Sequence, residues 1–346
     1  YLGPVDGHDV KYLTQLLSYA KELNGPVLLH VRTVKGKGYT PAERNPDQFH
    51  GVGRFCVETG ELVHGSGESF SAVFGETLCS LAEQDGKLCA ITAAMQGGTG
   101  LNRFARQFPA RFFDVGIAEG HAVAMAAGMA KQGMRPVFAV YSSFLQGEDG
   151  ETHHGVFDPA FLDTIPGMTV LCPSSFQELR EMLRYAIYDV EGPVAVRYSR
   201  GGEGAYQGSV PVEPATLLRT GADITLAGYG MMLNQLLDCA DRLARNGIQA
   251  EVVKLNTITP IPLERLTASV QKTGRLLVAE DSAAAGGVGQ RIAAGLFDAG
   301  IQVRGLALAN TGHAFVTHGT VPQLQRLCGL DGASLYHRAL EVCRHG

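Results

Sequence analysis

Glu119 is the residue whose type and surroundings point most directly to chemistry. It lies in the stretch GIAEGHAVAMAAGMA, residues 116–130, which otherwise consists mostly of glycine, alanine and apolar side chains. A carboxyl group buried among apolar atoms is costly unless it is paired or hydrogen-bonded. Glu119 is therefore either exposed to solvent or placed in this stretch for a chemical task.

Four polar, glycine-rich segments each follow an apolar run that is typical of a buried strand. They are residues 32–51, 92–100, 141–155 and 197–202. In open α/β sheets, ligands bind beyond the carboxyl ends of the strands. A glycine-rich loop at one such position is more often a plain turn, but together the four carry His50, Asp149, His153 and two arginines. The set as a whole therefore favours a ligand site.

The elements that must position these side chains follow an α/β pattern. Buried strands are predicted by apolar runs at 87–92, 135–142, 168–173 and 193–199. Residues 175–189 predict a helix between two of them. Continuously apolar strands separated by amphipathic helices indicate parallel sheets flanked by helices on both faces. We place this first domain at residues 65–212.

A second domain of the same kind is predicted for residues 213–346. Leu233, Leu236 and Leu243 recur at the 3.6-residue period of an amphipathic helix. Strands are predicted at 222–230, 249–256, 274–281 and 304–310. Residues 1–64 hold one predicted helix (9–23) and one predicted strand (26–34), which cannot bury a core by themselves. We expect them to belong to a domain whose remainder lies outside this sequence.

Composition and charge argue against several classes of protein. The 346 residues carry a formal charge of -5 without a long basic run, which argues against a nucleic-acid partner. No apolar run approaches the roughly 20 residues needed to span a membrane, and no signal peptide is visible. The seven cysteines are odd in number and scattered, so neither a zinc site nor a disulfide framework is expected. We expect a cytoplasmic protein with reduced cysteines.

A series of short motifs makes the interpretation specific. In chain order they are YLGPVDGHD, KGKGYTPAE, FHGVGRF, TAAMQGGTGL, FDVGIAEGHAV, YSSFLQ, GEDGETHHGVFD, VRYSRG and TPIP. Over nearly the whole chain this series resembles the 1-deoxy-D-xylulose-5-phosphate synthase family, thiamine-diphosphate enzymes of the transketolase superfamily. The resemblance implies the tail of a diphosphate-binding domain and a linker at 1–64, a thiamine-diphosphate-binding (pyrimidine) domain at 65–212, and a transketolase C-terminal domain at 213–346.

The resemblance also implies an activity, cofactors and partners. Members of the family are transferases that condense pyruvate with D-glyceraldehyde 3-phosphate, with loss of CO₂, through a thiamine-diphosphate enamine. This reaction is the first step of the non-mevalonate isoprenoid pathway and feeds thiamine and pyridoxal synthesis. The implied cofactors are thiamine diphosphate and Mg²⁺, and the implied assembly is a homodimer that needs neither nucleic acid nor a membrane.

Two alternatives remain open at this point. The β-subunit of a 2-oxo acid dehydrogenase E1 component also pairs a pyrimidine domain with this C-terminal domain. It does not account for YLGPVDGHD or KGKGYTPAE, which resemble the diphosphate-side domain. The other alternative is a non-catalytic fragment that only supports a dimer.

Six residues resemble cofactor-binding positions of the family: Lys35, Tyr39, Met95, Ile117, Glu119 and Phe144. Glu119 matches the acid that hydrogen-bonds to N1′ of the aminopyrimidine and shares a proton with it. Phe144 matches the aromatic residue that stacks on this ring, and Tyr39, with Lys35, matches a loop that closes over the cofactor. Met95 and Ile117 match apolar pocket residues, for which core packing is nearly as good an interpretation. We expect Glu119 to begin a helix and to be largely buried.

Five residues resemble positions that act on the substrates. His50 and His153 are, with the acid above, the implied catalytic residues, since imidazoles can move protons near neutral pH. Asp149 resembles the acid that holds a hydroxyl group of the acceptor. Tyr141 and Arg200 resemble the residues that grip the acceptor phosphate, for which a guanidinium group is well suited.

The sequence departs from the family pattern at three places. Gly120 stands where the family usually has glutamine. The G-D-G signature of the Mg²⁺-diphosphate site is absent, so we predict no metal ligand in this chain and expect the ligands in a missing N-terminal region. A family helix and strand are missing between YSSFLQ and GEDGETHHG, which predicts a break near Gln146 and Gly147. We therefore expect the chain by itself to be inactive.

Overall fold

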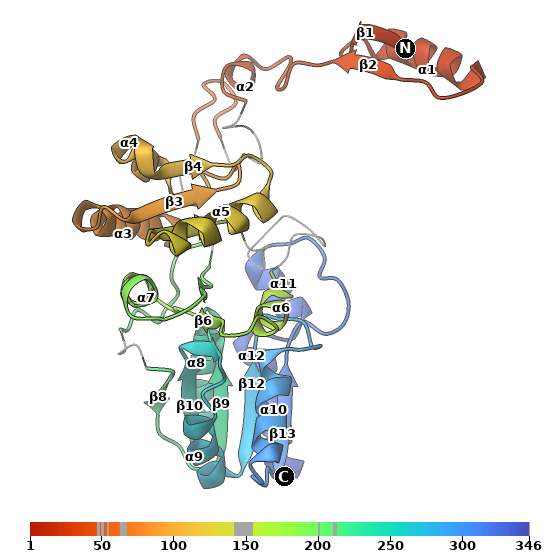
Figure 1. Ribbon diagram of the computed structural model, residues 1–346. Coiled ribbons are helices and arrows are strands. Elements are labelled where there is room, and N and C mark those ends of the chain that lie inside the picture. The colour runs from red at the N-terminus through yellow and green to blue at the C-terminus, as the bar shows by residue number, and fades with distance from the viewer. Residues whose placement is uncertain are drawn as a thin grey trace. The chain divides into compact units, whose positions relative to one another are not determined.

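The computed structural model describes residues 1–46, 49, 52–53, 55–62, 68–141, 155–199, 201–209 and 213–345 (Figure 1). The chain forms two compact units, Tyr1–Gly67 and Glu68–Gly346. The predicted α/β class is confirmed, because parallel strands alternate with helices through most of the larger unit.

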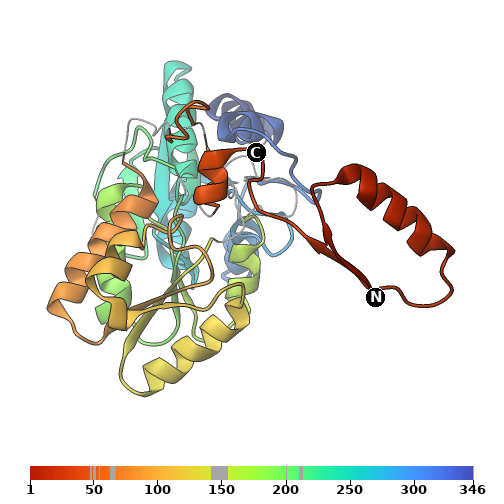
Figure 2. The same ribbon diagram turned by 90° about the horizontal axis from the view of Figure 1, so that it is seen from above.

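The unit Tyr1–Gly67 is built from a small parallel sheet and two helices. Strands β1 (Leu2–Asp6) and β2 (Leu29–Arg32) pair in parallel, and α1 (Val10–Glu22) lies to one side of them (Figure 2). The predicted helix and strand are confirmed, but the sequence analysis misses β1 and the short α2 (Thr40–Arg44). No side chain of α1 is buried, and Ala42 is the one buried apolar residue among those described in this unit. These elements enclose no core of their own.

Residues 68–141 form the first of two sheets in the predicted domain 65–212. Its parallel strands lie in the order β4-β3-β5 and are β3 (Leu88–Thr92), β4 (Phe112–Asp114) and β5 (Arg135–Ala139). The connecting elements are α3 (Phe70–Gln84), α4 (Asn102–Gln107), the 3-10 helix η1 (Pro109–Arg111) and α5 (Glu119–Lys131). Every residue of β3 is buried, as its central place in the sheet requires.

The second sheet of this domain has the order β11-β6-β7. Its elements are α6 (Asp158–Asp163), β6 (Thr169–Leu171), α7 (Phe176–Tyr188), β7 (Val194–Val196) and β11 (Thr257–Thr259), the last of which arrives from the C-terminal part and runs antiparallel to β6. The two sheets share one core, in which Val137 and Ala139 of β5 belong to the same cluster as Val196 of β7. In the described residues no strand joins β5 to β7. The strand that the sequence analysis finds missing would follow β5 in the chain.

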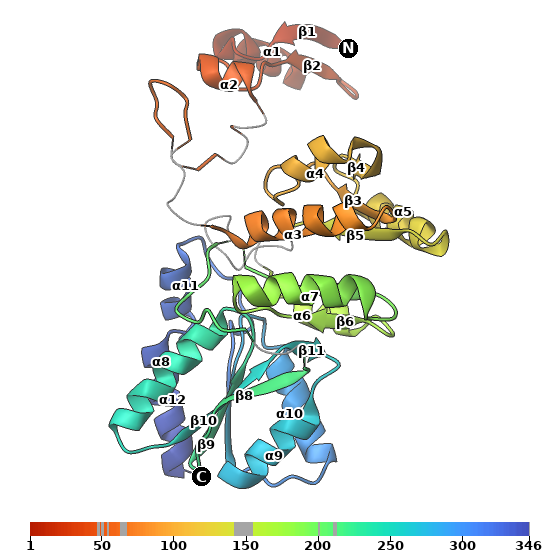
Figure 3. The ribbon, with the colours of Figure 1, turned by 90° about the vertical axis from the view of Figure 1, so that its left-hand side faces the viewer.

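The C-terminal part is a five-stranded sheet of order β13-β12-β9-β10-β8 with helices on both faces (Figure 3). Its strands are β8 (Ala215–Arg219), β9 (Ile224–Gly228), β10 (Ala250–Leu255), β12 (Arg275–Ala279) and β13 (Gly305–Ala309). Helices α8 (Met232–Arg245) and α12 (Gly332–His345) cover one face, α9 (Leu263–Thr273) and α10 (Val288–Asp298) cover the other, and α11 (Val321–Leu327) precedes α12. The four predicted strands are confirmed, and the antiparallel edge strand β8 is additional.

Two further observations concern the whole described chain. All seven cysteines are free, and four of them, Cys79, Cys89, Cys172 and Cys239, are buried. Burial raises the pKa of each of these four thiols, so they are poor nucleophiles. Among the described residues we find no helix of the length and apolarity that crossing a membrane requires.

Candidate active site

The carboxyl ends of β3, β4 and β5 lie at one edge of their sheet. Thr92, the last residue of β3, pairs with Asp114 of β4 on one side and with Ala139 of β5 on the other. Loops that leave these strand ends carry four of the predicted site residues: Met95, Ile117, Glu119 and Tyr141. The fold therefore brings these four to the edge at which open α/β sheets bind ligands.

Glu119 is the first residue of α5, as predicted. A helix N-terminus presents free backbone N–H groups and a partial positive charge, which favour an anionic side chain. The prediction that Glu119 is largely buried is wrong, because the residue is exposed. The physical reason is that α5 buries only Ala122, so the apolar residues that flank Glu119 in the sequence do not cover it.

Met95 and Ile117 differ in how the fold holds them. Met95 is half-buried, and its carbonyl oxygen accepts hydrogen bonds from the Thr99 N–H (3.0 Å) and hydroxyl (2.9 Å). Its sulfur accepts the N–H of Tyr141 at 3.5 Å, which ties the loop after β3 to the end of β5. Ile117 is 89% exposed. Core packing therefore does not explain Ile117, whose side chain is open to a ligand or to another protein surface.

Tyr141 lies against the glycine-rich loop that follows β3. A Cβ atom built on Gly98 would come within 1.6 Å of the Tyr141 hydroxyl oxygen and 2.3 Å of its Cζ, so a larger residue there would displace the Tyr141 ring. The Tyr141 phenol also lies near Tyr198, whose pKa is raised mainly by burial and further by Tyr141. Tyr141 is thus fixed at the strand edge by close packing on its glycine neighbour.

The remaining predicted site residues are not part of this edge as described. Five lie outside the described residues: His50, Phe144, Asp149, His153 and Arg200. The predicted break near Gln146 and Gly147 also lies outside them. Lys35 and Tyr39 belong to the other unit, where Lys35 is exposed and the Tyr39 hydroxyl donates to the carbonyl oxygen of Val57 at 2.8 Å.

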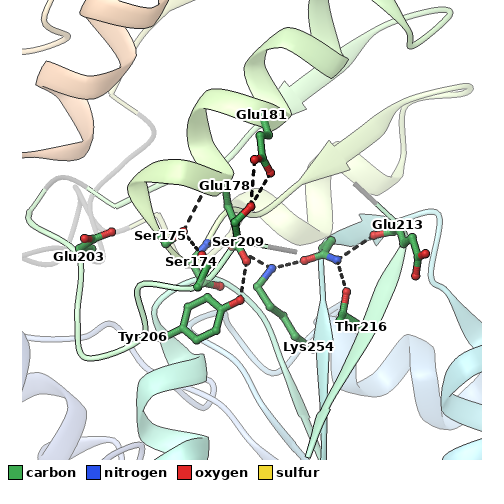
Figure 4. A network of polar contacts seen from close by, with 12 residues as sticks. Ser174, Ser175, Glu178, Glu181, Glu203, Tyr206, Ser209, Glu213, Thr216 and Lys254 are labelled. Carbon is green, nitrogen blue, oxygen red and sulfur yellow. Dashed lines mark hydrogen bonds and ion pairs between the residues drawn. The ribbon is translucent and has the colours of Figure 1, made fainter. Parts of the chain in front are cut away.

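A fully buried ion pair lies at the junction of the two predicted domains (Figure 4). Glu178, in the first turn of α7, accepts from Lys254 Nζ (3.1 Å), the Tyr206 hydroxyl (2.8 Å) and the Ser174 N–H (2.7 Å). Lys254 comes from β10 and also donates to Asn256. Burial lowers the pKa of Lys254, and the Glu178 carboxylate opposes this shift. The members of the cluster come from α7, from the segment between β7 and β8, and from β10. The cluster therefore connects one domain to the other.

A second buried cluster surrounds Arg197. Its guanidinium donates to both carboxylate oxygens of Asp281 (3.0 and 3.1 Å) and to the carbonyl oxygen of Gly155 (3.2 Å). Asp158 is 4% exposed, and its Oδ2 has no hydrogen-bond partner among the described residues. Burial raises the pKa of Asp158 to about 6, while Arg197 lowers it and Asp281 raises it further. Buried charges of this kind affect the stability of the fold. Neither cluster lies at the carboxyl ends of β3, β4 and β5.

Neither of these buried charge clusters was predicted from the sequence, although the sequence contains one indication of the first. Lys254 interrupts the apolar run of a predicted strand, and a lysine is almost never fully buried unless it is paired. Its partner, Glu178, lies on a helix of the other domain, and a one-dimensional pattern gives no means of finding it.

Comparisons with known proteins match each part of the chain. The family model described as "Transketolase, pyrimidine binding domain" matches residues 67–147 and 145–202. The models for "Transketolase, C-terminal domain" and "1-deoxy-D-xylulose-5-phosphate synthase" match residues 214–335 and 1–33. The pyrimidine-domain match comes in two pieces that meet at 145–147, where the sequence analysis finds a helix and strand missing.

Curated relatives are similar over almost the whole chain. The 1-deoxy-D-xylulose-5-phosphate synthase of Oleidesulfovibrio alaskensis is 43% identical over 383 aligned residues, which cover 99% of this chain and 59% of the relative. Synthase 1 of Geobacter sulfurreducens is 40% identical, with coverages of 97% and 58%. The chain thus spans less than two thirds of the length of these relatives. Since the alignment of 383 positions exceeds the chain's 346 residues, the first relative contains residues without a counterpart here.

A solved structure supports the same assignment. The chain is similar to a "Split gene transketolase, inactive beta4 tetramer", with a TM-score of 0.72 and 25% identity over 81% of this chain and 99% of that one. The match of residues 1–33 to a synthase model favours the synthase over the E1 β-subunit. The chain is therefore a homologue of 1-deoxy-D-xylulose-5-phosphate synthases that carries the pyrimidine-binding and C-terminal domains of transketolases.

Proposed function

We propose that this chain is the part of a 1-deoxy-D-xylulose-5-phosphate synthase that binds the aminopyrimidine end of thiamine diphosphate. The complete enzyme would condense pyruvate with D-glyceraldehyde 3-phosphate, with loss of CO₂, and so supply isoprenoid synthesis. The proposal rests above all on Glu119, at the start of α5 and at the same sheet edge as Met95. The pyrimidine domain is assigned to 65–212 and the C-terminal domain to 213–346, with 1–64 as the tail of a diphosphate-binding domain.

The described residues fit the pyrimidine end of this cofactor. The Glu119 carboxylate can share a proton with a ring nitrogen, and Met95 and Ile117 offer apolar atoms to the ring. A Cβ atom on Gly116 or Gly120 would meet nothing within 4 Å, so the space beside Glu119 is open. No three His, Cys, Asp or Glu side chains among the described residues gather into a possible metal site, and the sequence lacks the G-D-G signature of the Mg²⁺-diphosphate end. We assign the Mg²⁺ ligands to a region outside this chain.

The chain's own residues bind, orient and hold protons. When bound, thiamine diphosphate supplies the electron sink that decarboxylation of pyruvate requires. Glu119 holds a proton at N1′ of the aminopyrimidine. Because Glu119 lies in the first turn of a helix, its backbone has a fixed position from which the carboxylate extends. The further roles carried by the family resemblance are ring stacking by Phe144, a closing loop with Lys35 and Tyr39, proton movement by His50 and His153, and binding of the acceptor by Tyr141, Asp149 and Arg200.

We also propose that the chain self-associates through α5. Ile117 is 89% and Val123 59% exposed, and Ala122 is the one buried residue of this apolar helix. A contiguous exposed apolar surface is typical of a protein interface. The solved protein that is similar to this chain over 81% of its length is itself described as a beta4 tetramer. A second copy of this chain is therefore the proposed partner of α5.

The test reconstitutes the complete site. The chain is combined with the region of the Oleidesulfovibrio alaskensis synthase that it does not cover, together with Mg²⁺, thiamine diphosphate, pyruvate and D-glyceraldehyde 3-phosphate. CO₂ release and deoxyxylulose phosphate are measured. Glu119→Gln should lower the formation of both products by about 10²- to 10⁴-fold, whereas Glu76→Gln, at an exposed glutamate of α3, should not. Cofactor binding without either product would identify the chain as a non-catalytic scaffold and contradict the proposal.

A further inference from the structure

We propose that Asp114 is a positioning residue of this site. Its carboxylate joins the loop that carries Met95 to the loop that carries Ile117 and Glu119. The inference rests on the proposed function, because it concerns how the cofactor-binding loops are held. The sequence analysis does not single out Asp114, which lies at the end of β4.

A single carboxylate oxygen makes the connection. Oδ1 of Asp114 accepts the backbone N–H of Ala94 at 2.8 Å and that of Gly116 at 3.0 Å. Ala94 directly precedes Met95, and Gly116 directly precedes Ile117. Hydrogen bonds to an ionised acceptor are shorter and stronger than neutral ones, so a carboxylate is well suited to hold two turns at once.

The turn at Ala94 has a backbone conformation that needs such support. The φ angles of Ala94 and Gly116 are 58° and 67°, in the left-handed region. Ala94 is the one non-glycine residue with a positive φ in the part of the chain that the structure describes. A non-glycine residue keeps this conformation only where its surroundings determine it. The hydrogen bond from its N–H to Asp114 is part of those surroundings.

The restraint extends from each turn to the residues of the site. On one side, the Ala118 N–H donates to the carbonyl oxygen of Gly116 at 2.8 Å, directly before Glu119 begins α5. On the other side, Met95 is held by Thr99 and Tyr141 through the bonds described above. Without the carboxylate, the two loops lose their direct side-chain connection. A ligand that contacts both loops would then bind a less organised site.

The test compares two substitutions of Asp114 with a matched control. Asp114→Ala removes both bonds, while Asp114→Asn keeps an oxygen that can accept both. The control is Asp223→Ala, because the Asp223 carboxylate also accepts a backbone N–H, that of Gln249 at 2.6 Å, but in the C-terminal domain. Calorimetric titration with thiamine diphosphate and Mg²⁺ is carried out on the reconstituted enzyme. Amide hydrogen exchange is measured on the chain itself.

We expect Asp114→Ala to weaken cofactor binding about tenfold or more, Asp114→Asn to stay within about threefold, and Asp223→Ala to match the parent. Exchange at Ala94 and Gly116 should accelerate in Asp114→Ala alone. Parent-like binding by Asp114→Ala overturns the inference and leaves the proposed function standing. Absence of cofactor binding by the parent overturns both. If Asp114→Ala also loses the exchange protection of β3, Asp114→Ser takes its place under the same criteria.

Discussion

Two glutamates in the first turns of α5 and α7 have opposite surroundings. Glu178 is 1% exposed and accepts from Lys254, Tyr206 and Ser174. Glu119 is exposed, and its carboxylate makes no hydrogen bond or ion pair with another described residue. Glu178, which connects the two domains, has a full set of buried partners. The fold leaves the other acid at a strand edge, exposed and without such partners among the described residues.

The two helices differ in the same way as their acids. Each has 13 residues, but α7 buries five of them and α5 buries one. The exposed face of α5 is nevertheless apolar, which costs solubility unless another surface covers it. Helix α5 is apolar and exposed, and it begins with an exposed acid. These properties agree with the proposal that a ligand and a protein partner cover its surface.

The largest expected effect concerns the partner that the Glu119 carboxylate lacks among the described residues. The chain alone, supplied with Mg²⁺, thiamine diphosphate, pyruvate and D-glyceraldehyde 3-phosphate, should release no CO₂. The sequence lacks the G-D-G signature of the Mg²⁺-diphosphate site, and lost metal contacts should weaken cofactor binding by several kcal/mol, about tenfold for each 1.4 kcal/mol. Robust CO₂ release would mean that the chain does hold the metal.

Next in size is the substitution of the exposed acid itself. In the reconstituted enzyme, Glu119→Gln should lower turnover by about 10² to 10⁴, the usual range for loss of a proton-transfer group. Because the carboxylate has no partner in the described fold, the urea midpoint of the chain should not move. Near-normal turnover would remove Glu119 from the site, and a large loss of stability would remove the contrast with Glu178.

The opposite result is expected for the buried pair. Lys254→Met should destabilise the chain by about 3–5 kcal/mol, because it leaves the Glu178 carboxylate buried without its cation. The double variant Lys254→Met with Glu178→Gln should recover much of the loss, since glutamine can still accept from Tyr206 and Ser174. Urea unfolding measures both. A single variant within about 1 kcal/mol of the parent would show that the pair contributes little.

The contrast between the two acids also marks what sequence reasoning can reach. Strands such as β3 and helices such as α7 were predictable because the pattern of apolar residues within each segment is enough to identify it. The start of α5 at Glu119 was predictable from its motif. Short edge strands were not: β8 is half-exposed and its pairing with β10 is set by distant residues.

Burial and pairing were beyond the same reasoning. Apolar neighbours in sequence predicted a buried Glu119, but on α5 those neighbours face solvent themselves. Glu178 and Lys254 meet only because α7 and β10 pack at the domain junction. Asp114 was overlooked because its partners are backbone N–H groups of two turns, which no side-chain motif records.

A third acid, Asp158, is buried like Glu178 but incompletely satisfied, and it should respond to pH. Its pKa is about 6 against 3.8 for the unmodified group, chiefly through burial, with Arg197 opposing and Asp281 adding to the shift. A carboxyl whose folded pKa is raised loses stability as pH rises from about 4 to 6. Asp158→Asn should therefore be more stable than the parent by about 1–3 kcal/mol above pH 7 and equal to it below pH 4.

Thermal midpoints across this pH range check the expectation, with Asp189→Asn as a matched control at an exposed aspartate. The control makes the same substitution without changing a buried carboxyl group. A parent-like pH profile for Asp158→Asn would show that the Asp158 carboxylate, despite its burial, is solvated in both states.

The smallest expected change in the chain's own stability comes from the exposed face of α5. Val123 is 59% exposed, so Val123→Asp removes no core contact. It should change the free energy of unfolding by less than about 0.5 kcal/mol. Its effect should appear in assembly, because a charge placed on an apolar interface must be desolvated when a second copy binds. Light scattering should find the parent dimeric or larger and Val123→Asp monomeric at the same concentration. The control Glu76→Asp, at an exposed position of α3, should assemble like the parent. If Val123→Asp stays assembled, self-association uses another surface, and the exposed apolar face of α5 is covered by a different part of the enzyme.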